Sequence, residues 1–405
     1  MSLSNVAAGN YSIVARATDN SGAAADSAPV NLSVAAATTT TAAAGKITAG
    51  PTMGLAGYRT FTFTPSASGG TIRWSVTRLT TPQLGGSTTT TSNVFTATGA
   101  TASFNLTQIS GSQTIYRVTA RDSGATDTRE IQVFAPGAKT AFVYKTAGNP
   151  DVPMYITVPA NLTSATHVLL NMHGNGRTAS SYHDAWYRWT RNNNYILVTP
   201  YFSDANWPDS GYHQGNVFEA ENCVGSLNPQ SRWSFTIVDS AFTHLKSRFQ
   251  LNDNKYDIWG HSAGAQFVHR MMLWKADARI RFGMAANSGW YTAPDTSIAC
   301  PYGLRNPLLN FTTQQLVDYT NRHMIIFRGT EDTLRDSDLR TTWQADAQGR
   351  NRWERAQYMY NKGVEINTNL NWQLIAVPDS GHDKDTMAPG AQEFLLNPTP
   401  NLSFQ

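Results

Sequence analysis

The chain has 405 residues, of which 40% are hydrophobic and only 15% are charged, and its formal net charge is +3. This length favours two or three domains, and the apolar fraction is enough for at least one sizeable core. No run of five or more Lys or Arg residues occurs, so we expect no nucleic acid partner. No stretch of about 18 apolar residues occurs either, so we expect no transmembrane helix.

The start of the chain and its cysteines bear on where the protein works. Residues 1–4 lack the charged and apolar segments of a signal peptide, so we expect the sequence to begin at a truncated point. Low charge with abundant Thr, Ser, Ala and Gly is common in secreted modular proteins, and we expect an extracellular location. Cys223 and Cys300 are the only cysteines and form no Cys-x-x-Cys pair, so we expect no metal and no cofactor. We predict one disulfide between them, with two buried free thiols as the alternative.

The N-terminal part has the pattern of β-structure. Residues 11–34 show two alternating apolar runs around Asp19-Asn20-Ser21-Gly22, which predicts a hairpin. A similar piece recurs at 116–134, again with Asp-Ser-Gly at the turn, so both pieces are read as the last two strands of one kind of module. Because almost nothing precedes the first copy, we interpret residues 1–35 as the stub of a truncated module. Residues 36–45, rich in Ala and Thr, are interpreted as a linker.

The second copy has a full module ahead of it, spanning residues 46–136. Strands are expected at 59–63, 71–77, 102–106, 114–120 and 130–134. Their spacing fits a small β-sandwich and resembles bacterial immunoglobulin-like domains.

From residue 137 the pattern changes to alternating strands and helices. Strands are expected at 141–145, 154–158, 167–172, 195–199, 256–259, 282–286, 324–328 and 372–377. Helices are expected at 180–191, 234–249, 265–275, 345–361 and 388–396. Short apolar strands between helices indicate a mostly parallel sheet covered on both faces. We therefore expect residues 137–405 to form an α/β-hydrolase domain with an eight-stranded sheet.

The segment Gly260-His261-Ser262-Ala263-Gly264 fits the pattern G-x-S-x-G between an expected strand and an expected helix. A sharp strand–turn–helix elbow needs small residues because the backbone folds back under the serine. Ser262 is therefore the predicted nucleophile. The alternative is a Gly-rich surface turn with an idle serine.

Chain order then points to the partners of Ser262, because in this fold the acid and then the histidine follow the serine. The acid is expected after the strand at 324–328, where we choose Asp332; Glu331 is its rival, and Asp336 and Asp338 are alternatives. The base is expected after the last strand, where His382 lies in a Gly-containing loop. His261, His269 and His323 are read as structural.

Two backbone N–H groups are expected to bind the oxyanion. One belongs to Ala263, directly after the nucleophile, and the other to Asn175 in the loop His173-Gly174-Asn175-Gly176. The alternative for this loop is a structural β–α turn. Together these groups predict acyl-enzyme catalysis, in which His382 accepts the serine proton and Asp332 holds the imidazole.

Several of these stretches carry a family resemblance. The loop at 173–176, WGHSAGAQFVHR at 259–270, ANSGWYT at 286–292 and GHDKDTMAP at 381–389 resemble secreted bacterial α/β-hydrolases related to polyhydroxybutyrate depolymerases and feruloyl or acetylxylan esterases. The resemblance implies an esterase acting on a polymer or its fragments. The depolymerases usually carry Gly-x-Ser-x-Gly-Gly, whereas Ala265 follows here, so the motif does not fix a polyester substrate.

Aromatic residues in the loops after the strands form a candidate substrate cleft. We single out Trp207, Trp290 and Tyr291, because loops at the carboxyl ends of strands line the cleft of an open α/β sheet. Ordinary loop packing is the alternative.

Two other functions stay open: a peptidase on the same fold, and a surface-binding protein with a hydrolase scaffold. The oligomeric state is left open.

Overall fold

The computed structural model describes residues 9–14, 16–19, 21–34, 45–49, 53–66, 70–82, 89–109 and 112–398. Apart from Gly45, the expected linker at 36–45 lies outside this part of the chain. Among the helices described, none combines the length and the apolar character needed to cross a membrane.

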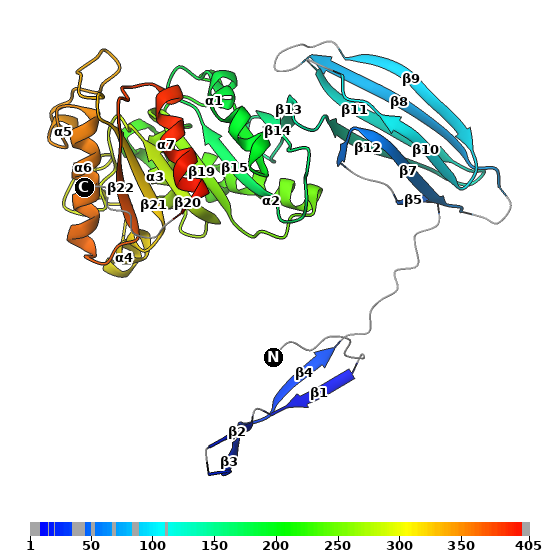
Figure 1. The fold of residues 1–405 in the computed structure, drawn as a ribbon, viewed down its shortest axis with the longest axis horizontal. Coiled ribbons are helices and arrows are strands. Elements are labelled where there is room, and N and C mark those ends of the chain that lie inside the picture. The colour runs from blue at the N-terminus through cyan, green and yellow to red at the C-terminus, as the bar shows by residue number, and fades with distance from the viewer. Residues whose placement is uncertain are drawn as a thin grey trace.

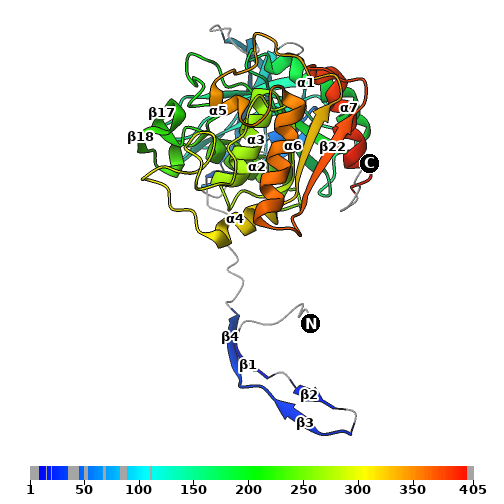
Figure 2. The same cartoon turned by 90° about the vertical axis from the view of Figure 1, so that its left-hand side faces the viewer.

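Residues 9–34 form two short antiparallel strand pairs, drawn as one narrow ribbon in Figure 2. Strand β1 (Gly9–Ile13) pairs with β4 (Val30–Val34), and β2 (Arg16–Thr18) pairs with β3 (Ala24–Asp26). The chain reverses at the predicted turn, where the Asp19 carboxylate accepts hydrogen bonds from the backbone N–H groups of Ser21 and Ala23. The hairpin is therefore present, while its origin as the end of a truncated module stays a prediction.

Residues 45–134 form two sheets that share one hydrophobic core. The first sheet has the order β10-β7-β5 and the second the order β6-β12-β11-β8-β9. The strands are β5 (Lys46–Ala49), β6 (Met53–Leu55), β7 (Gly57–Thr64), β8 (Arg73–Pro82), β9 (Thr90–Thr98), β10 (Thr101–Leu106), β11 (Ser112–Arg121) and β12 (Thr126–Phe134). Phe61 and Phe104 from the first sheet pack with Trp74, Val118 and Ile131 from the second. All five expected strands are found, and β5, β6 and β9 are additional.

An eight-stranded sheet dominates the rest of the chain (Figure 1), in the order β13-β14-β16-β15-β19-β20-β21-β22. Pairs that involve β13 or β14 are antiparallel, and all pairs from β16 to β22 are parallel. The strands are β13 (Lys139–Tyr144), β14 (Val152–Thr157), β15 (His167–Met172), β16 (Tyr195–Pro200), β19 (Tyr256–His261), β20 (Ile280–Ala286), β21 (Met324–Gly329) and β22 (Trp372–Val377). The sheet agrees with the eight strands expected from the sequence.

Helices cover both faces of this sheet. Successive side chains of a strand point to opposite faces, so neighbouring residues of one strand belong to different cores. In β15, Leu169 packs with α1 (Ala179–Asn192) and α7 (Lys384–Leu396). The neighbouring residue Leu170 belongs to the core on the other face. That second face is covered by α2 (Ser234–Phe249), α3 (Ala263–Trp274), α4 (Thr313–Thr320) and α6 (Arg352–Ile366). Figure 2 shows α2, α3 and α6 gathered on this side.

The structure corrects one helix. The single helix expected at 345–361 is two helices, α5 (Trp343–Asp346) and α6 (Arg352–Ile366). Gly349 lies between them with φ +143°, a conformation that L side chains rarely adopt, and so it interrupts the helical pattern. A small antiparallel pair, β17 (Phe218–Ala220) and β18 (Val224–Leu227), lies in the long connection between β16 and α2.

A buried aromatic residue links the β-rich part to the core of the large sheet. Phe134, the last residue of β12, is buried and belongs to the core of the large sheet rather than to that of the β-rich part. Its ring packs edge-on against Phe142, with 6.3 Å between centroids, and lies 5.8 Å from the ring of Phe249. Gln132 Nε2 also donates to Ala141 O at 3.2 Å, and β11 lies in contact with β13, so the two parts are joined by several contacts of which Phe134 is the aromatic one.

Candidate active site

Ser262 lies at a strained turn between β19 and α3. Its φ and ψ are 59° and −119°, a conformation that costs free energy for any residue with a side chain. Small residues make the turn possible: a Cβ on Gly260 would lie 2.2 Å from Gly264 O, and one on Gly264 would lie 2.2 Å from Met172 O. The pattern G-x-S-x-G is thus explained by close backbone approach on both sides of the serine.

Three side chains predicted from chain order come together at this turn. His382 Nε2 lies 3.0 Å from Ser262 Oγ, and His382 Nδ1 lies 2.8 Å from Asp332 Oδ2. Asp332 follows β21 and His382 follows β22. These strands are parallel neighbours, so the loops that follow them leave the same edge of the sheet. A chain of hydrogen bonds therefore runs from a carboxylate through an imidazole to a hydroxyl.

Asp332 is buried and has a second partner that sequence analysis missed. The Arg352 guanidinium, 1% exposed, lies 3.3 Å from Asp332 Oδ1. Arg352 also donates to both carboxylate oxygens of Asp336, at 2.6 and 3.0 Å, and this ion pair lowers the pKa of Asp336. Asp336 is therefore a partner of Arg352, whereas Glu331 is exposed. Of the acids considered, Asp332 is the one hydrogen-bonded to His382.

Asn287 joins the loop of the acid to the loop of the histidine. Its side-chain Nδ2 donates to Gly381 O at 2.9 Å, and its Oδ1 accepts from Gly329 N at 2.8 Å. The residue is fully buried and has φ 49°, which asparagine tolerates better than most residues. It lies in the stretch ANSGWYT, but nothing in its local pattern marks this role.

The loop after β15 is held rigidly beside the serine. The buried His173 donates from Nδ1 to Gly174 O at 2.9 Å and accepts at Nε2 from Phe202 N at 3.1 Å. Burial lowers the pKa of His173 to about 3, so the imidazole stays neutral in both roles. A Cβ on Gly174 would lie 2.3 Å from Tyr182 Oη, so this position needs glycine. Asn175 and Ala263, the two predicted oxyanion donors, both line the cavity above Ser262.

His261 supports the site without joining the hydrogen-bonded chain. Its ring lies 4.6 Å from the ring of His382, and its Nδ1 is 3.0 Å from Tyr182 Oη. Burial, followed by the charge of His382, lowers the pKa of His261. His269 is also structural, because its Nδ1 bonds Ala265 O and its Nε2 accepts from Thr292 N.

A cavity of about 640 Å³ opens over the serine, and most of its lining is polar. It is lined by Gly174, Asn175, Gly176, Thr178, Ser181, Tyr182, Asp209, His213, His261, Ser262, Ala263, Gln266, Gly289, Trp290, Ser337, Asp338, Arg340, Arg352, His382, Asp383 and Lys384. The expected aromatic cleft is therefore largely wrong. Trp290 lines the cavity, but Tyr291 and Trp207 are buried in the hydrophobic core and do not.

Of the other aromatic residues in the connection between β16 and α2, Tyr201 is half-buried and lines a separate cavity, and four more pack inward. Phe202, Tyr212, Phe218 and Trp233 are buried in the same core as Trp207. Apolar side chains gain more from burial under a loop than from exposure in a cleft, so aromatic residues in a long connection do not by themselves indicate a ligand site.

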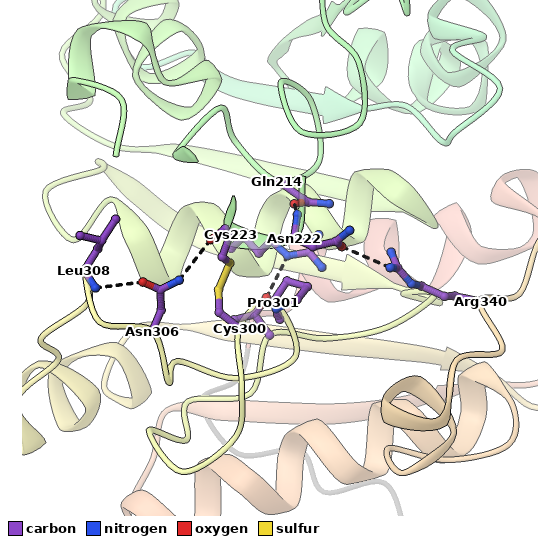
Figure 3. The surroundings of a disulfide bond; sticks show 10 residues. Gln214, Asn222, Cys223, Cys300, Pro301, Asn306, Leu308 and Arg340 are labelled. Carbon is purple, nitrogen blue, oxygen red and sulfur yellow. Dashed lines mark hydrogen bonds between the residues drawn. A yellow bond between two sulfur atoms is a disulfide. The ribbon is translucent and has the colours of Figure 1, made fainter. Parts of the chain in front are cut away.

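Cys223 and Cys300 form a disulfide, with their Cα atoms 5.9 Å apart. Figure 3 shows the bond beside Asn222, whose backbone N–H donates to Gln214 Oε1 at 2.8 Å. The Asn222 side chain accepts a hydrogen bond from Arg340, a residue of the cavity wall. The disulfide thus ties the β17–β18 region to the loop after β20, next to the cavity.

An eight-stranded, mostly parallel sheet with a serine at a sharp strand–helix elbow is the architecture of an α/β-hydrolase. No protein-family model matches the chain, and no curated protein sequence does. Among solved structures, the chain is similar to poly(aspartic acid) hydrolase-1 of Sphingomonas sp. KT-1, with 31% identity, a TM-score of 0.61, and 65% of this chain and 100% of that chain covered. It is also similar to a poly(3-hydroxybutyrate) depolymerase of Bordetella parapertussis, with 26% identity, a TM-score of 0.60, and 66% and 92% covered.

The chain therefore belongs to the α/β-hydrolase family that includes poly(aspartic acid) hydrolase-1, and it is a hydrolase. The matched share agrees in extent with the part of the chain that follows the β-rich region.

Proposed function

We propose that the protein is a serine hydrolase that cleaves carboxylic esters through an acyl-enzyme, with Ser262, His382 and Asp332 as its catalytic triad. The observation that carries the proposal is the hydrogen-bonded chain of these three side chains, which ends at a hydroxyl facing a cavity. A hydroxyl bonded to an oriented imidazole is the activated nucleophile of acyl transfer.

In the proposed reaction, His382 Nε2 accepts the proton of Ser262 as Oγ attacks the carbonyl carbon. Asp332 holds the Nδ1 proton and stabilises the imidazolium. The backbone N–H groups of Ala263 and Asn175 bind the oxyanion, and His382 returns the proton to the leaving alcohol. Water, activated by the same imidazole, then releases the acid and restores the serine.

The proposal extends to the rest of the chain. We propose that residues 46–136 form an immunoglobulin-like module that is dispensable for the chemistry, because the triad and oxyanion residues all lie after residue 170. An extracellular location is proposed on the disulfide, since such bonds persist in oxidising compartments.

A second candidate is cleavage of an amide polymer by the same triad. It is favoured by one observation, the 31% identity with a hydrolase named for poly(aspartic acid). The two candidates differ in the leaving group and share the acyl-enzyme step.

The test is a substrate panel run on the full chain and on Ser262→Ala. The panel contains 4-nitrophenyl esters of increasing chain length, acetylated xylan, a feruloyl ester, a polyester film and poly(aspartic acid). We expect turnover of at least one ester by the full chain and a loss of roughly 1000-fold or more in Ser262→Ala. Turnover of poly(aspartic acid) alone selects the second candidate. A folded Ser262→Ala chain that keeps its turnover refutes both.

A further inference from the structure

Two guanidinium groups lie against the single tryptophan of the catalytic cavity. Arg270 Cζ is 4.0 Å and Arg340 Cζ is 5.0 Å from the centre of the Trp290 ring. Within the described part of the chain, neither arginine has a carboxylate oxygen within 4.0 Å. Arg352, the third arginine near this cavity, differs because two aspartates neutralise it. The Trp290 end of the cavity therefore has positive charge without a direct counter-ion.

Arg270 is fixed and fully enclosed. Its guanidinium donates to Thr292 Oγ1 at 3.0 Å, to His213 O at 2.9 Å and to Gln266 Oε1 at 3.1 Å, all neutral acceptors. Burial, and then the charge of Arg340, lowers the pKa of Arg270 to about 9, so it still carries its charge at neutral pH. Burying a cation without an anion beside it costs free energy, and proteins retain such unpaired charges mainly at binding sites.

Arg340 lines the cavity itself, and two hydrogen bonds hold it in place. Its Nη2 donates to Asn222 Oδ1 at 3.2 Å, and its backbone oxygen accepts from Arg355 at 2.9 Å. Asn222 precedes the disulfide-bonded Cys223, as Figure 3 shows. A guanidinium has five N–H donors, and this is the single side-chain hydrogen bond that Arg340 makes to the described residues.

No acidic group among the described residues forms an ion pair with Arg270 or Arg340, although the charge of Asp209 acts on both from beyond 4.0 Å. Asp209 is already bound by Arg177 at 2.9 Å and lies 3.4 Å from His213. Asp338 and Asp383 lie at the exposed rim, where water screens them. Lys384 is paired with Asp385. The cation best placed to meet a ligand in the cavity is Arg340.

We propose that Arg340, supported by Arg270 through the shared ring of Trp290, is a carboxylate-binding subsite, and that the substrates cleaved at Ser262 carry a carboxylate. The planar fork of an arginine matches the two oxygens of a carboxylate. The substrate claim rests on the proposed function, whereas the binding claim does not depend on turnover.

The test compares two esters of equal chain length, 4-nitrophenyl hexanoate and the 4-nitrophenyl monoester of adipic acid, which differ by a terminal carboxylate. We expect Arg340→Gln to lose about 10- to 100-fold more kcat/KM on the adipate ester than on the hexanoate, mainly through KM, as for loss of a charged hydrogen bond. Arg350→Gln, an exposed arginine outside the cavity lining, is the control and is expected to change neither.

A second variant keeps both arginines and changes Asn222, the hydrogen-bond partner of Arg340. Asn222→Asp keeps the size and the positive φ of 59° but gives Arg340 a carboxylate partner. We expect it to weaken activity on the adipate ester more than on the hexanoate. Equal losses on both esters in Arg340→Gln and in Asn222→Asp would overturn the subsite.

Direct binding separates this inference from the proposed function. Calorimetry with adipate on Ser262→Ala needs no turnover, and we expect binding that Arg340→Gln abolishes. Binding of adipate in the absence of any esterase activity would support the subsite and reject the proposed function. Turnover of hexanoate without any effect of Arg340→Gln on adipate binding would do the reverse.

An inhibition assay then tells which carboxylate of a polymer binds. A C-terminally amidated aspartate oligomer offers side-chain carboxylates, whereas a 3-hydroxybutyrate oligomer with a free carboxyl end offers one at the chain end.

Discussion

The position of the loop beside Ser262 depends on the absence of a side chain at Gly174. Its neighbour Asn175 is a proposed oxyanion donor, and Tyr182 Oη fills the space that a Cβ would need, while also bonding His261 Nδ1 at 3.0 Å. Because Tyr182 is buried and engaged, it has little freedom to move away. The position of the oxyanion loop is therefore set by a contact that only glycine allows.

We expect Gly174→Ala to displace this loop and to lower kcat by about 100-fold, the usual cost of losing one oxyanion donor. Gly176→Ala in the same loop is the matched control, because a Cβ there would meet nothing within 4 Å. Steady-state kinetics on a soluble ester compare the two variants. Equal effects at both positions would show that the Tyr182 contact does not set the loop.

Asn287 makes a second residue-scale prediction. Asn287→Asp keeps the shape and the backbone preference but replaces the N–H₂ donor to Gly381 O with an oxygen, and the two oxygens repel each other. The loop of His382 is then no longer tied to the loop of Asp332. We expect kcat to fall by roughly tenfold or more with a smaller change in KM, as for groups that act in the transition state. A change confined to KM would argue against this positioning role.

At the scale of elements, the two related turns that begin at Asp19 and at Asp122 are each closed by hydrogen bonds to the aspartate. Asp122 accepts hydrogen bonds from Ser66 N at 2.6 Å and Ser66 Oγ at 2.8 Å, and also from the backbone N–H groups of Gly124 and Ala125. Asp19 caps its own turn in the same way through Ser21 and Ala23. The difference is that Asp122 also bonds Ser66, which ties the end of β7 in one sheet to the turn between β11 and β12 in the other.

These bonds, those of Ser66 first, lower the pKa of Asp122 to about 2. A carboxylate with a depressed folded-state pKa adds stability that is present above its unfolded value near 3.8 and is lost as pH falls from about 4 toward 2. We expect Asp122→Asn to speed amide hydrogen exchange in β7, β11 and β12 at pH 7 and to flatten the acid dependence. Asp19→Asn is the control, and an equal effect of that change would refute the cross-strand role.

Which elements could be predicted follows from where their apolar residues lie. β15 and β22 were located to the residue, because each is a short, largely apolar run that precedes a helix. β9 was missed because it faces solvent along most of its length and five of its nine residues are Thr or Ser. α5 and α6 were merged because the helical pattern was continued through Gly349, whose φ of +143° cannot be read from the sequence.

The same contrast holds for the site. Ser262, Asp332 and His382 each follow a recognisable strand, so chain order was enough to bring them together. Arg352 and Arg340 were missed, because they follow no strand end and have no motif of their own. Partners of this kind come from side-chain packing, which a single sequence does not record.

At the scale of the whole molecule, buried neutral histidines set the acid stability. His173, His183, His213, His261 and His269 are buried, and desolvation is the main cause that lowers the pKa of each, to about 3 for His173 and about 4 for His213. The unfolded chain binds these protons near pH 6.5, while the folded chain does not. Stability is therefore complete above this pH and falls as pH drops below it, by up to about 1.4 kcal/mol per pH unit for each group.

We expect the urea midpoint of unfolding to be flat from pH 8 to 7 and to fall steeply between pH 6.5 and 5. Among the described residues, His183 hydrogen-bonds Thr157 and Thr199, so His183→Gln is expected to reduce the slope by about one proton in the folded variant. Tryptophan fluorescence in urea at each pH measures this. A midpoint that stays constant down to pH 5 would contradict the account.

The central claim is that Ser262 is a nucleophile activated by His382. The most direct measurement is the site and rate of labelling by a fluorophosphonate, followed by mass spectrometry of the peptide that contains residues 259–270. The account predicts one adduct, on Ser262, formed at least 100-fold more slowly in His382→Ala and absent from this peptide in Ser262→Ala. Labelling at another serine, or a rate that does not change without His382, would contradict it.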